Sequence, residues 1–361
     1  MAAPPPIDDR PRLPAKSDYG IAIVGCGGIV NYAHLPAYAA HGLRVLGCYD
    51  VNAEAAKETA ERHGLGRVYA SLGELLADEA VEIVDVAVQP WHQRAIAEAA
   101  LAAGKHLLLQ KPLAVEVADG VAIIEAGRRA GRKVAVNQQM RWTGGIAAAR
   151  QLIAAGYVGQ PTDVQIQVSV TTPWSMWPWL QRSPRLDVLY HSIHYLDTVR
   201  SLVGDPEWVT ARHARYPGQT EVAETKTLTV LDYPSGLQAL IAVNHHNETG
   251  GSHAIFRVIG TGGIVEGTIG LLAEYPAGGL DTVRCRQADD PADVWHDIPL
   301  TTLWMPDAFI GTMGSLMEAI QSDGVPVTDA ADNLTTLRLV HACYRSAAEN
   351  RSVRLEEVIA S

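Results

Sequence analysis

The stretch IAIVGCGGIVNYAHLP, residues 21–36, decides the fold. Four apolar residues suited to a buried strand, 21–24, lead directly into the turn Gly25-Cys26-Gly27-Gly28, and a helical segment follows. Gly25 permits a tight turn, and Gly27 lets the backbone approach a ligand closely. The N-terminus of the next helix offers unbonded N–H groups and the positive end of the helix dipole. This arrangement predicts a binding site for a pyrophosphate in an α/β fold.

Apolar runs continue to alternate with alanine-rich helical segments up to about residue 140. The expected strands are residues 21–24, 45–49, 83–88, 106–109 and 134–136. Continuous apolar strands separated by helices predict a parallel sheet that is covered on both faces. We therefore expect a doubly wound Rossmann domain over residues 19–140.

A different pattern begins after residue 141. Residues 163–170 alternate polar and apolar side chains, which is typical of a sheet with one face in water. The turn at residues 233–236 predicts a hairpin, and residues 254–269 predict another strand pair. Residues 330–350 return to a helical pattern. Residues 141–361 are expected to form an α+β domain with a mainly antiparallel sheet, whose C-terminal helices are free to pack on the first domain.

The bulk composition limits the class of protein. The 361 residues are 47% hydrophobic and 19% charged, and 29 Lys+Arg against 40 Asp+Glu give a net charge of -11, which argues against a nucleic-acid partner. Neither a membrane-spanning run nor a signal peptide is evident. The four cysteines are far apart and predict buried apolar side chains. Residues 1–18 are expected to be a disordered arm on a cytoplasmic protein.

An aspartate at the end of the second expected strand strengthens the dinucleotide hypothesis. Asp50 follows Gly25 by 25 residues and is placed to accept hydrogen bonds from an adenosine ribose. Its charge would repel a 2′-phosphate, and no arginine occurs in the residues directly after it, 51–57, so NAD is favoured over NADP. Val30 occupies the position of the third fingerprint glycine. A simple glycine turn with an aspartate that caps the next helix is the alternative.

A lysine ends the fourth expected strand, in the segment LLLQKPLA at residues 107–114. Pro112 cannot continue a central strand or a helix interior. Ligands of open α/β sheets bind beyond the carboxyl ends of the strands, where Lys111 would meet a bound nicotinamide. Burial lowers the pKa of a lysine toward neutrality and makes it a usable proton donor or acceptor. The alternative is a surface lysine in a loop.

Several segments together resemble a known family. They are VGCGGI (24–29), HLPAY (34–38), ALAAGKHLLLQKPLA (100–114), HSIHYLDTVRSLVG (191–204), DAFIGTMGSLMEAI (307–320) and DNLTTLRLVHACYRSAAENRSVRL (332–355). In this order they are similar to the Gfo/Idh/MocA family, named after glucose-fructose oxidoreductase, inositol dehydrogenase and rhizopine catabolism. The resemblance implies a Rossmann domain followed by a large, open, mixed and mainly antiparallel sheet that shapes the substrate cleft and often the subunit interface.

The resemblance also implies roles for individual residues. The family's Glu-Lys-Pro signature is Gln110-Lys111-Pro112 here, so the lysine near hydride transfer is kept and the acid is replaced by an amide. In YHSIHYLD, residues 190–197, His194 matches the catalytic histidine, and Asp197, one helical turn later, is placed to orient or cap and is expected among the substrate-binding residues. Tyr190 stands where the family usually has aspartate, and its phenol is expected to donate to a substrate oxygen.

The remaining candidates surround these positions. The expected cofactor-binding residues are Gly25, Gly27, Gly28, Ile29, Asp50, Gln89, Pro90, His92, Gln110, Lys111, Asn137 and Gln139. Arg94 stands where relatives carry a histidine, so either His92 is its substitute or the contact is absent. Arg141 is expected to bind a substrate carboxylate or sugar hydroxyls, with a salt bridge as the alternative.

An aromatic loop precedes the histidines. Trp174, Trp177 and Trp179 fall within a proline-rich segment and are interpreted as a wall for the apolar face of a sugar, with a subunit contact as the alternative. His191 is an additional substrate-binding candidate. His245 and His246 are neighbours, so they would point to opposite faces of a strand, and no metal site is expected.

These patterns lead to one favoured function and two alternatives. The favoured function is an NAD-dependent dehydrogenase or reductase acting on a secondary alcohol of a sugar, polyol or sugar acid, with Lys111 and His194 as the acid/base pair. The first alternative is transient oxidation by bound NAD that enables elimination or glycoside cleavage without net NADH. The second is a non-catalytic dinucleotide or sugar sensor. A homodimer or homotetramer through the C-terminal sheet is expected from the resemblance, and no membrane partner.

Overall fold

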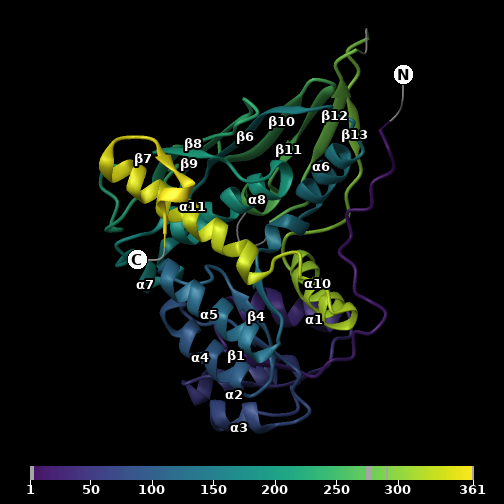
Figure 1. Ribbon diagram of the computed structural model, residues 1–361, viewed down its shortest axis with the longest axis vertical. Helices are drawn as coiled ribbons and strands as arrows, with labels where there is room; N and C mark the ends of the chain where they lie inside the picture. Colours follow the sequence, from purple (N-terminus) through teal and green to yellow (C-terminus); the bar gives the residue numbers. More distant parts are fainter. Residues whose placement is uncertain (1–3, 274–277, 290–291, 360–361) are drawn as a thin grey trace. The chain divides into compact units, whose positions relative to one another are not determined.

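The computed structural model describes residues 4–273, 278–289 and 292–359. These residues form two compact units (Figure 1). One unit, here called the parallel-sheet unit, contains residues 11–139 and 305–334. The other, the mixed-sheet unit, contains residues 4–10, 140–304 and 335–359.

The parallel-sheet unit has a five-stranded sheet in the order β2-β1-β3-β4-β5, with every pair parallel. Its strands are β1 (Ile21–Val24), β2 (Val45–Tyr49), β3 (Ile83–Val86), β4 (His106–Gln110) and β5 (Val134–Asn137). Every residue of β1, β3 and β5 is buried, which is possible only where both faces of a sheet are covered. The predicted Rossmann sheet is confirmed.

Helices cover this sheet and connect its strands. They are η1 (Val30–His34), α1 (Leu35–Ala40), α2 (Ala53–His63), α3 (Leu72–Ala77), α4 (Pro90–Ala102), α5 (Val117–Ala130) and α10 (Ala308–Ser322). α4 packs on α5 and on strands β3 and β4, whereas α10 packs on α1, β4 and β5. Although helix α10 belongs to the C-terminal part of the chain, its apolar face completes the cover of this sheet.

The mixed-sheet unit has nine strands in the order β13-β12-β11-β10-β6-β9-β8-β7-β14, antiparallel except for β6 with β9. They are β6 (Pro161–Ser169), β7 (Trp208–Ala214), β8 (Lys226–Asp232), β9 (Gln238–Asn244), β10 (His253–Gly260), β11 (Gly263–Thr268), β12 (Val283–Gln287), β13 (His296–Ile298) and β14 (Val353–Arg354). Alternate residues along β6, β8, β9 and β10 are buried. The predicted mixed, mainly antiparallel sheet with one open face is confirmed.

The buried face of this sheet is covered by helices. α6 (Gly144–Ala154) and α8 (Ile193–Val203) pack on one another and on strands of the sheet, as Figure 1 shows. The other helical segments are η2 (Gln139–Trp142), η3 (Trp174–Met176), α7 (Pro178–Gln181), η4 (Val188–Ser192), α9 (Gly270–Ala273), α11 (Ala330–Glu349) and η5 (Leu355–Glu357).

The N-terminal segment departs from the expected disordered arm. It has no helix or strand over residues 4–20, but the Asp9 carboxylate is buried and accepts the N–H groups of Thr301 and Thr302, both at 2.7 Å. Burial alone would raise the pKa of Asp9, but these hydrogen bonds outweigh it and lower the pKa. Composition alone could not reveal this contact, because the two backbone N–H groups that meet the carboxylate lie 292 and 293 residues away in the sequence.

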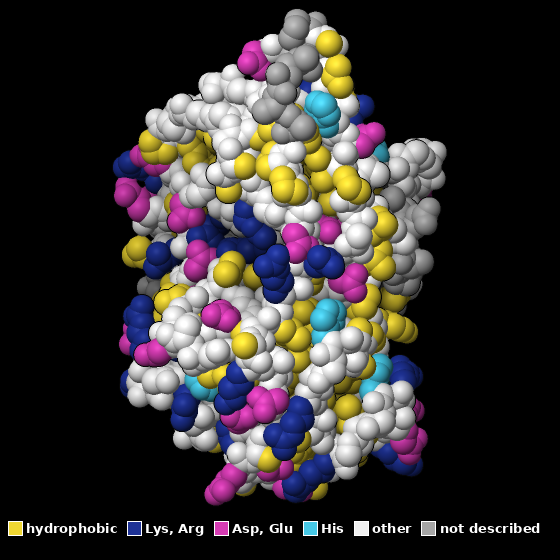
Figure 2. All heavy atoms as spheres, turned by 90° about the vertical axis from the view of Figure 1, so that its right-hand side faces the viewer, with side chains coloured by type: hydrophobic (Ala, Val, Ile, Leu, Met, Phe, Trp, Pro, Cys, Tyr) yellow, Lys and Arg dark blue, Asp and Glu magenta, His cyan; other side chains and the backbone are white. Residues whose placement is uncertain are grey.

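Two further observations concern the surface and the membrane. Within the described ranges, no helix is both long and apolar enough to cross a bilayer. On the side of the molecule drawn in Figure 2, basic and acidic side chains are interspersed, which agrees with the absence of Lys/Arg runs in the sequence.

Candidate functional site

The glycine turn lies at the carboxyl end of β1, as predicted. Gly25 has a φ of +95°, and a Cβ there would lie 2.4 Å from the carbonyl oxygen of Ala87, so both its conformation and its packing require glycine. A Cβ at Gly27 would meet no atom within 4 Å. Gly27 and Gly28 are both exposed, so their backbone is open to a ligand. These features fit the pyrophosphate of a dinucleotide.

Asp50 is tied to the same turn. Its Oδ2 accepts the Cys26 N–H at 2.7 Å, and its Oδ1 accepts the Asn52 N–H at 2.8 Å. Asn31 supports the turn from the other side, because its amide donates to the carbonyl oxygens of Cys26 and Gly27. Asn31 was missed by the sequence analysis, where it was only one polar residue of a helix. The carboxylate of Asp50 is therefore held beside the turn, at the position for which the sequence predicts a ribose contact.

Lys111 follows β4 at the carboxyl edge of the parallel sheet. Its backbone N–H donates to Oε1 of Gln110 at 2.8 Å. Burial lowers the pKa of Lys111 from 10.5 to about 8. Asn137, at the end of the neighbouring β5, is fully buried, as is Gln139 in η2. The expected positions at the ends of β4 and β5 thus lie at one edge of the sheet.

The segment Gln89-Pro90-Trp91-His92 begins helix α4 at the end of the β3 region. Gln89 is the residue before the helix and Pro90 its first residue. Gln93, which the sequence analysis missed, is buried and donates to the carbonyl oxygens of Pro112 and Leu113 at 2.6 and 3.2 Å. Arg94 lies on the surface in ion pairs with Glu98 and Asp119. The start of α4 is therefore fastened to the loop that carries Lys111.

The mixed-sheet unit contains the second group of candidates. η4, a single π-helical turn, runs into α8 and carries Tyr190 and His191, while His194 lies in the first turn of α8. His194 is almost fully buried, and its ring packs edge-on against Trp304 at 5.5 Å between centroids. Tyr190 packs edge-on against Trp179 at 5.2 Å, and burial raises the pKa of its phenol.

The three tryptophans do not form one exposed wall. Trp174 is buried and packs on His191 at 4.8 Å and on His245 at 5.7 Å between ring centroids. Trp177 and Trp179 are only partly buried. Trp177 lies 6.2 Å from His191 between ring centroids. Of the three, Trp177 and Trp179 therefore offer the more accessible indole faces.

A buried carboxylate organises the region behind His191. Asp187 accepts the hydroxyl groups of Ser192 and Thr227, and lies 3.0 Å from Nε2 of His245. His246 instead contacts Glu221. Among the described residues, no three His, Cys, Asp or Glu side chains are grouped so that they could hold a metal ion.

Arg141 and Asp197 pair with one another. Nε and Nη2 of Arg141 lie 2.7 Å from the two carboxylate oxygens of Asp197, and Thr336 donates to the same carboxylate at 2.8 Å. Both side chains are over 90% buried. The expected substrate contacts of this pair are therefore corrected to the salt-bridge alternative, since the charged ends face each other. The two residues are 56 positions apart in the sequence, and no local pattern indicates that they pair.

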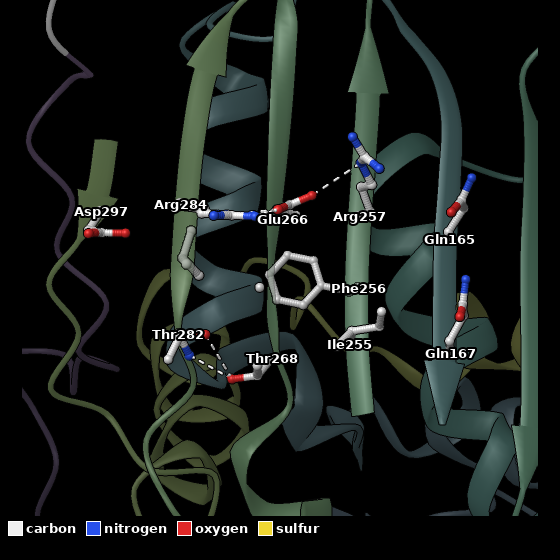
Figure 3. Close-up of a pocket in the computed structure, with 12 residues that line it drawn as sticks. Gln165, Gln167, Ile255, Phe256, Arg257, Glu266, Thr268, Thr282, Arg284 and Asp297 are labelled. Atoms are coloured by element: carbon white, nitrogen blue, oxygen red, sulfur yellow. Dashed lines mark hydrogen bonds and ion pairs between the residues drawn. The ribbon is translucent and has the colours of Figure 1, made fainter. Parts of the chain in front are cut away.

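A hollow of about 470 Å³ lies on the mixed sheet, away from the candidate side chains. Figure 3 shows side chains from neighbouring strands around it, including Gln165, Ile255 and Arg257. Glu266 lies between Arg257 and Arg284 in this view and forms ion pairs with both. None of the expected site residues lines this hollow.

Comparison with known proteins identifies the class. A model of the oxidoreductase family's NAD-binding Rossmann fold matches residues 19–138, and a model of the same family's C-terminal alpha/beta domain matches residues 150–355. The protein is thus an oxidoreductase with an NAD-binding domain. It belongs to the Gfo/Idh/MocA family, which confirms the resemblance drawn from the sequence motifs.

Individual relatives are distant. The chain is 28% identical to D-apiose dehydrogenase of Paraburkholderia graminis, over 93% of this chain and 90% of that protein. It is 27% identical to 1,5-anhydro-D-fructose reductase of Ensifer adhaerens, over 84% and 89%. An Agrobacterium radiobacter oxidoreductase, solved with NAD+, L-tartaric acid and magnesium, has a TM-score of 0.83 at 24% identity, over 95% of this chain and 100% of that one. Its likeness supports the fold.

The pairing of Arg141 with Asp197 can be tested through its contribution to the stability of the protein. Asp197→Asn leaves a buried guanidinium without its counter-charge, and should lower the free energy of unfolding by about 3–5 kcal/mol in urea denaturation. The exposed pair Arg345–Glu349 is the control, and Glu349→Gln should cost no more than about 1 kcal/mol. The double variant Arg141→Met/Asp197→Leu should recover much of the loss. Equal costs at both sites would contradict the pairing.

Proposed function

We propose that the protein oxidises a secondary hydroxyl of a sugar, polyol or sugar acid with NAD, or catalyses the reverse reduction. The observation that carries the proposal is Lys111, a lysine with a lowered pKa at the carboxyl edge of the parallel sheet. Ligands of such sheets bind at that edge, next to the glycine turn. When bound, NAD would supply the hydride acceptor or donor.

Lys111 suits a proton-transfer role on chemical grounds. With a pKa of about 8, a substantial fraction of the amine is neutral close to physiological pH, and it can take the proton of a hydroxyl as its carbon loses hydride. An ordinary lysine with a pKa of 10.5 would be almost wholly protonated. We assign Lys111 as the proton acceptor in oxidation and the proton donor in reduction.

His194 and Tyr190 are proposed to complete the polar contacts to the substrate. His194 is proposed as the partner of Lys111 at the reacting hydroxyl. Because burial raises the pKa of Tyr190, the phenol keeps its proton at neutral pH and is a hydrogen-bond donor. Arg141 and Asp197 are proposed to hold α8 by their ion pair and not to touch the substrate.

The substrate class is supported by two observations. Trp177 and Trp179 are partly exposed near His191 and Tyr190, and indole faces suit the apolar face of a sugar ring. The relatives named above act on D-apiose and 1,5-anhydro-D-fructose. NAD is preferred over NADP in this proposal, because the carboxylate of Asp50 beside the turn would repel a 2′-phosphate.

Replacement of Lys111 tests the proposal. A panel of sugars and polyols, including D-apiose, 1,5-anhydro-D-fructose and inositols, is screened by NADH absorbance with NADP in parallel. On the best substrate, Lys111→Met should lower kcat/KM by about 10²- to 10⁴-fold and leave NAD affinity nearly unchanged. In the wild type, kcat/KM for oxidation should rise with pH and level off above about 8, because the amine must be neutral to accept a proton.

The control is Lys133→Met, which removes a lysine from the amino end of β5 at the opposite edge of the same sheet. Its kinetics should match the wild type. A Lys111→Met enzyme with normal turnover would disprove the assignment. NAD that co-purifies with no compound giving net NADH would instead favour redox-assisted elimination.

We also propose that the open face of the mixed sheet joins two copies of the chain. One register row across this face contains, in order, Thr210, Val230, Leu240, Gln165, Arg257, Glu266, Arg284 and Asp297. The row is apolar at one end and carries both signs of charge at the other, so a second copy of the same face, turned by a two-fold axis, offers matching partners. Leu228, Leu240 and Ile255 are large apolar side chains that remain exposed on it.

A charge in the apolar part of this face should separate the copies. The wild type should sediment as a dimer or tetramer, and Leu240→Glu should shift it toward monomer, because a buried unpaired carboxylate opposes association. Val325→Glu places the same charge at an exposed valine outside this face and should leave the assembly intact. A monomeric wild type, or an unchanged mass for Leu240→Glu, would contradict the interface.

A further inference from the structure

A chain of buried polar side chains lies behind Lys111, entirely within the parallel-sheet unit. Its centre is His34, at the end of η1, which is completely buried. Nδ1 of His34 lies 2.7 Å from Oδ2 of Asp85, a fully buried residue of β3. Tyr38 donates its hydroxyl to the same oxygen at 2.7 Å. A lone aspartate inside an apolar strand thus has two close partners.

The other ring nitrogen of His34 faces two amides. Nε2 lies 3.2 Å from Nδ2 of Asn137 and 3.4 Å from Nε2 of Gln110. The carbonyl oxygen of Asn137 accepts the hydroxyl of Thr312 at 2.8 Å. The carbonyl oxygen of Gln110 accepts the backbone N–H of Lys111. Side chains from η1, β3, β4, β5 and α10 therefore meet at one imidazole.

The positions of the hydrogen atoms in this network follow from one group whose role is fixed, the backbone N–H of Lys111. A backbone N–H only donates, so the N–H of Lys111 requires the oxygen of the Gln110 amide on its side. The NH₂ group of Gln110 must then face His34. Nε2 of His34 therefore has to accept, and the ring hydrogen is on Nδ1, directed at Asp85.

A second proton on His34, placed on Nε2, would disrupt this arrangement of donors and acceptors. An Nε2–H would face the NH₂ groups of Gln110 and Asn137, and unmatched buried donors are costly. Turning the Gln110 amide over would relieve that conflict but would set its NH₂ group against the N–H of Lys111. The rings of Phe309 and Tyr38 enclose the imidazole, at 5.0 and 6.1 Å between centroids, so water has little access to it.

We propose that His34 and Asp85 are positioning residues, which hold Gln110 through a neutral, Nδ1-protonated imidazole and thereby fix the backbone that presents Lys111. The proposal rests on the proposed function of Lys111 for its kinetic effect. The hydrogen-bond arrangement itself does not depend on that function. Gln110 is accordingly assigned to this network, in place of the direct cofactor contact expected from the sequence.

The protonation of His34 can be measured without any activity. In ¹⁵N-histidine-labelled protein at neutral pH, the His34 resonances should show a protonated Nδ1 and an unprotonated Nε2. The resonances are identified as the pair that shifts both in Tyr38→Phe and in Gln110→Met, since these variants alter opposite ends of the network. An imidazolium, or a hydrogen on Nε2, would overturn the proposal.

Two substitutions at Gln110 test the link to Lys111. Gln110→Met keeps the length of the side chain but removes the acceptor for the Lys111 N–H, so kcat should fall about 10- to 100-fold, with the KM for NAD within about threefold of wild type. Gln110→Glu keeps an acceptor oxygen for the Lys111 N–H but loses the NH₂ group that faces His34, so its kcat should fall less than that of Gln110→Met. An unchanged kcat in Gln110→Met, or equal losses in both variants, would contradict the positioning role.

Gln151→Met is the matched control. Gln151 also uses both ends of its amide in hydrogen bonds, to the N–H and the carbonyl oxygen of Asp8, in the mixed-sheet unit. Its replacement should lower stability without changing kcat. If Lys111→Met proves active, the proposed function fails, while the nitrogen shifts of His34 still decide whether the network has the order described here.

Discussion

The burial of strand β4 on both faces is the constraint on which the proposed chemistry depends. Leu107, Leu108 and Leu109 are completely buried, so a charged side chain without partners would be costly in the middle of the strand. The first position at which the chain can present an ammonium is the carboxyl edge. There Gln110 satisfies the backbone N–H of Lys111, and the start of α4 holds the following loop through Gln93.

The protein buries charge in three different ways. Lys111 is partly withdrawn from water, and the cost of desolvation is expressed as a lowered pKa, which makes the amine reactive. Arg141 and Asp197 face each other at two points, so each charge is compensated and the pair is suited to structural support. Asp85 is stabilised by two donors, one of them an imidazole whose other side is occupied by amides.

The fold could be predicted from the sequence because it follows from periodicity and punctuation. The glycine turn, the continuous apolar strands and the alternation in residues 163–170 each specify one element with its exposed or buried faces. Polar pairs distant in sequence could not be predicted in this way. Arg141 and Asp197 were both taken for substrate contacts, and Asp9 was placed in a disordered arm, because the partner of a buried charge depends on packing.

The sequence predicted which positions form the candidate site, but it did not predict the hydrogen bonds and ion pairs among their side chains. Lys111 and Asp50 lie at strand ends, which the motifs indicate directly. His34 and Asp85 carried weaker signals, a histidine before a proline-containing helix and a single aspartate in the apolar strand IVDV. Gln110 departs from the family's acidic residue, and in the structure its amide supplies an NH₂ group that a carboxylate would lack.

The central claim is that Lys111 transfers the proton of the reacting hydroxyl. It is tested most directly by a crystal structure of the protein with NADH and the best non-reacting analogue of the sugar found in the screen. The account predicts that Nζ of Lys111 lies within hydrogen-bond distance of the oxygen on the carbon nearest to nicotinamide C4. A complex in which that oxygen does not contact Lys111 would contradict it.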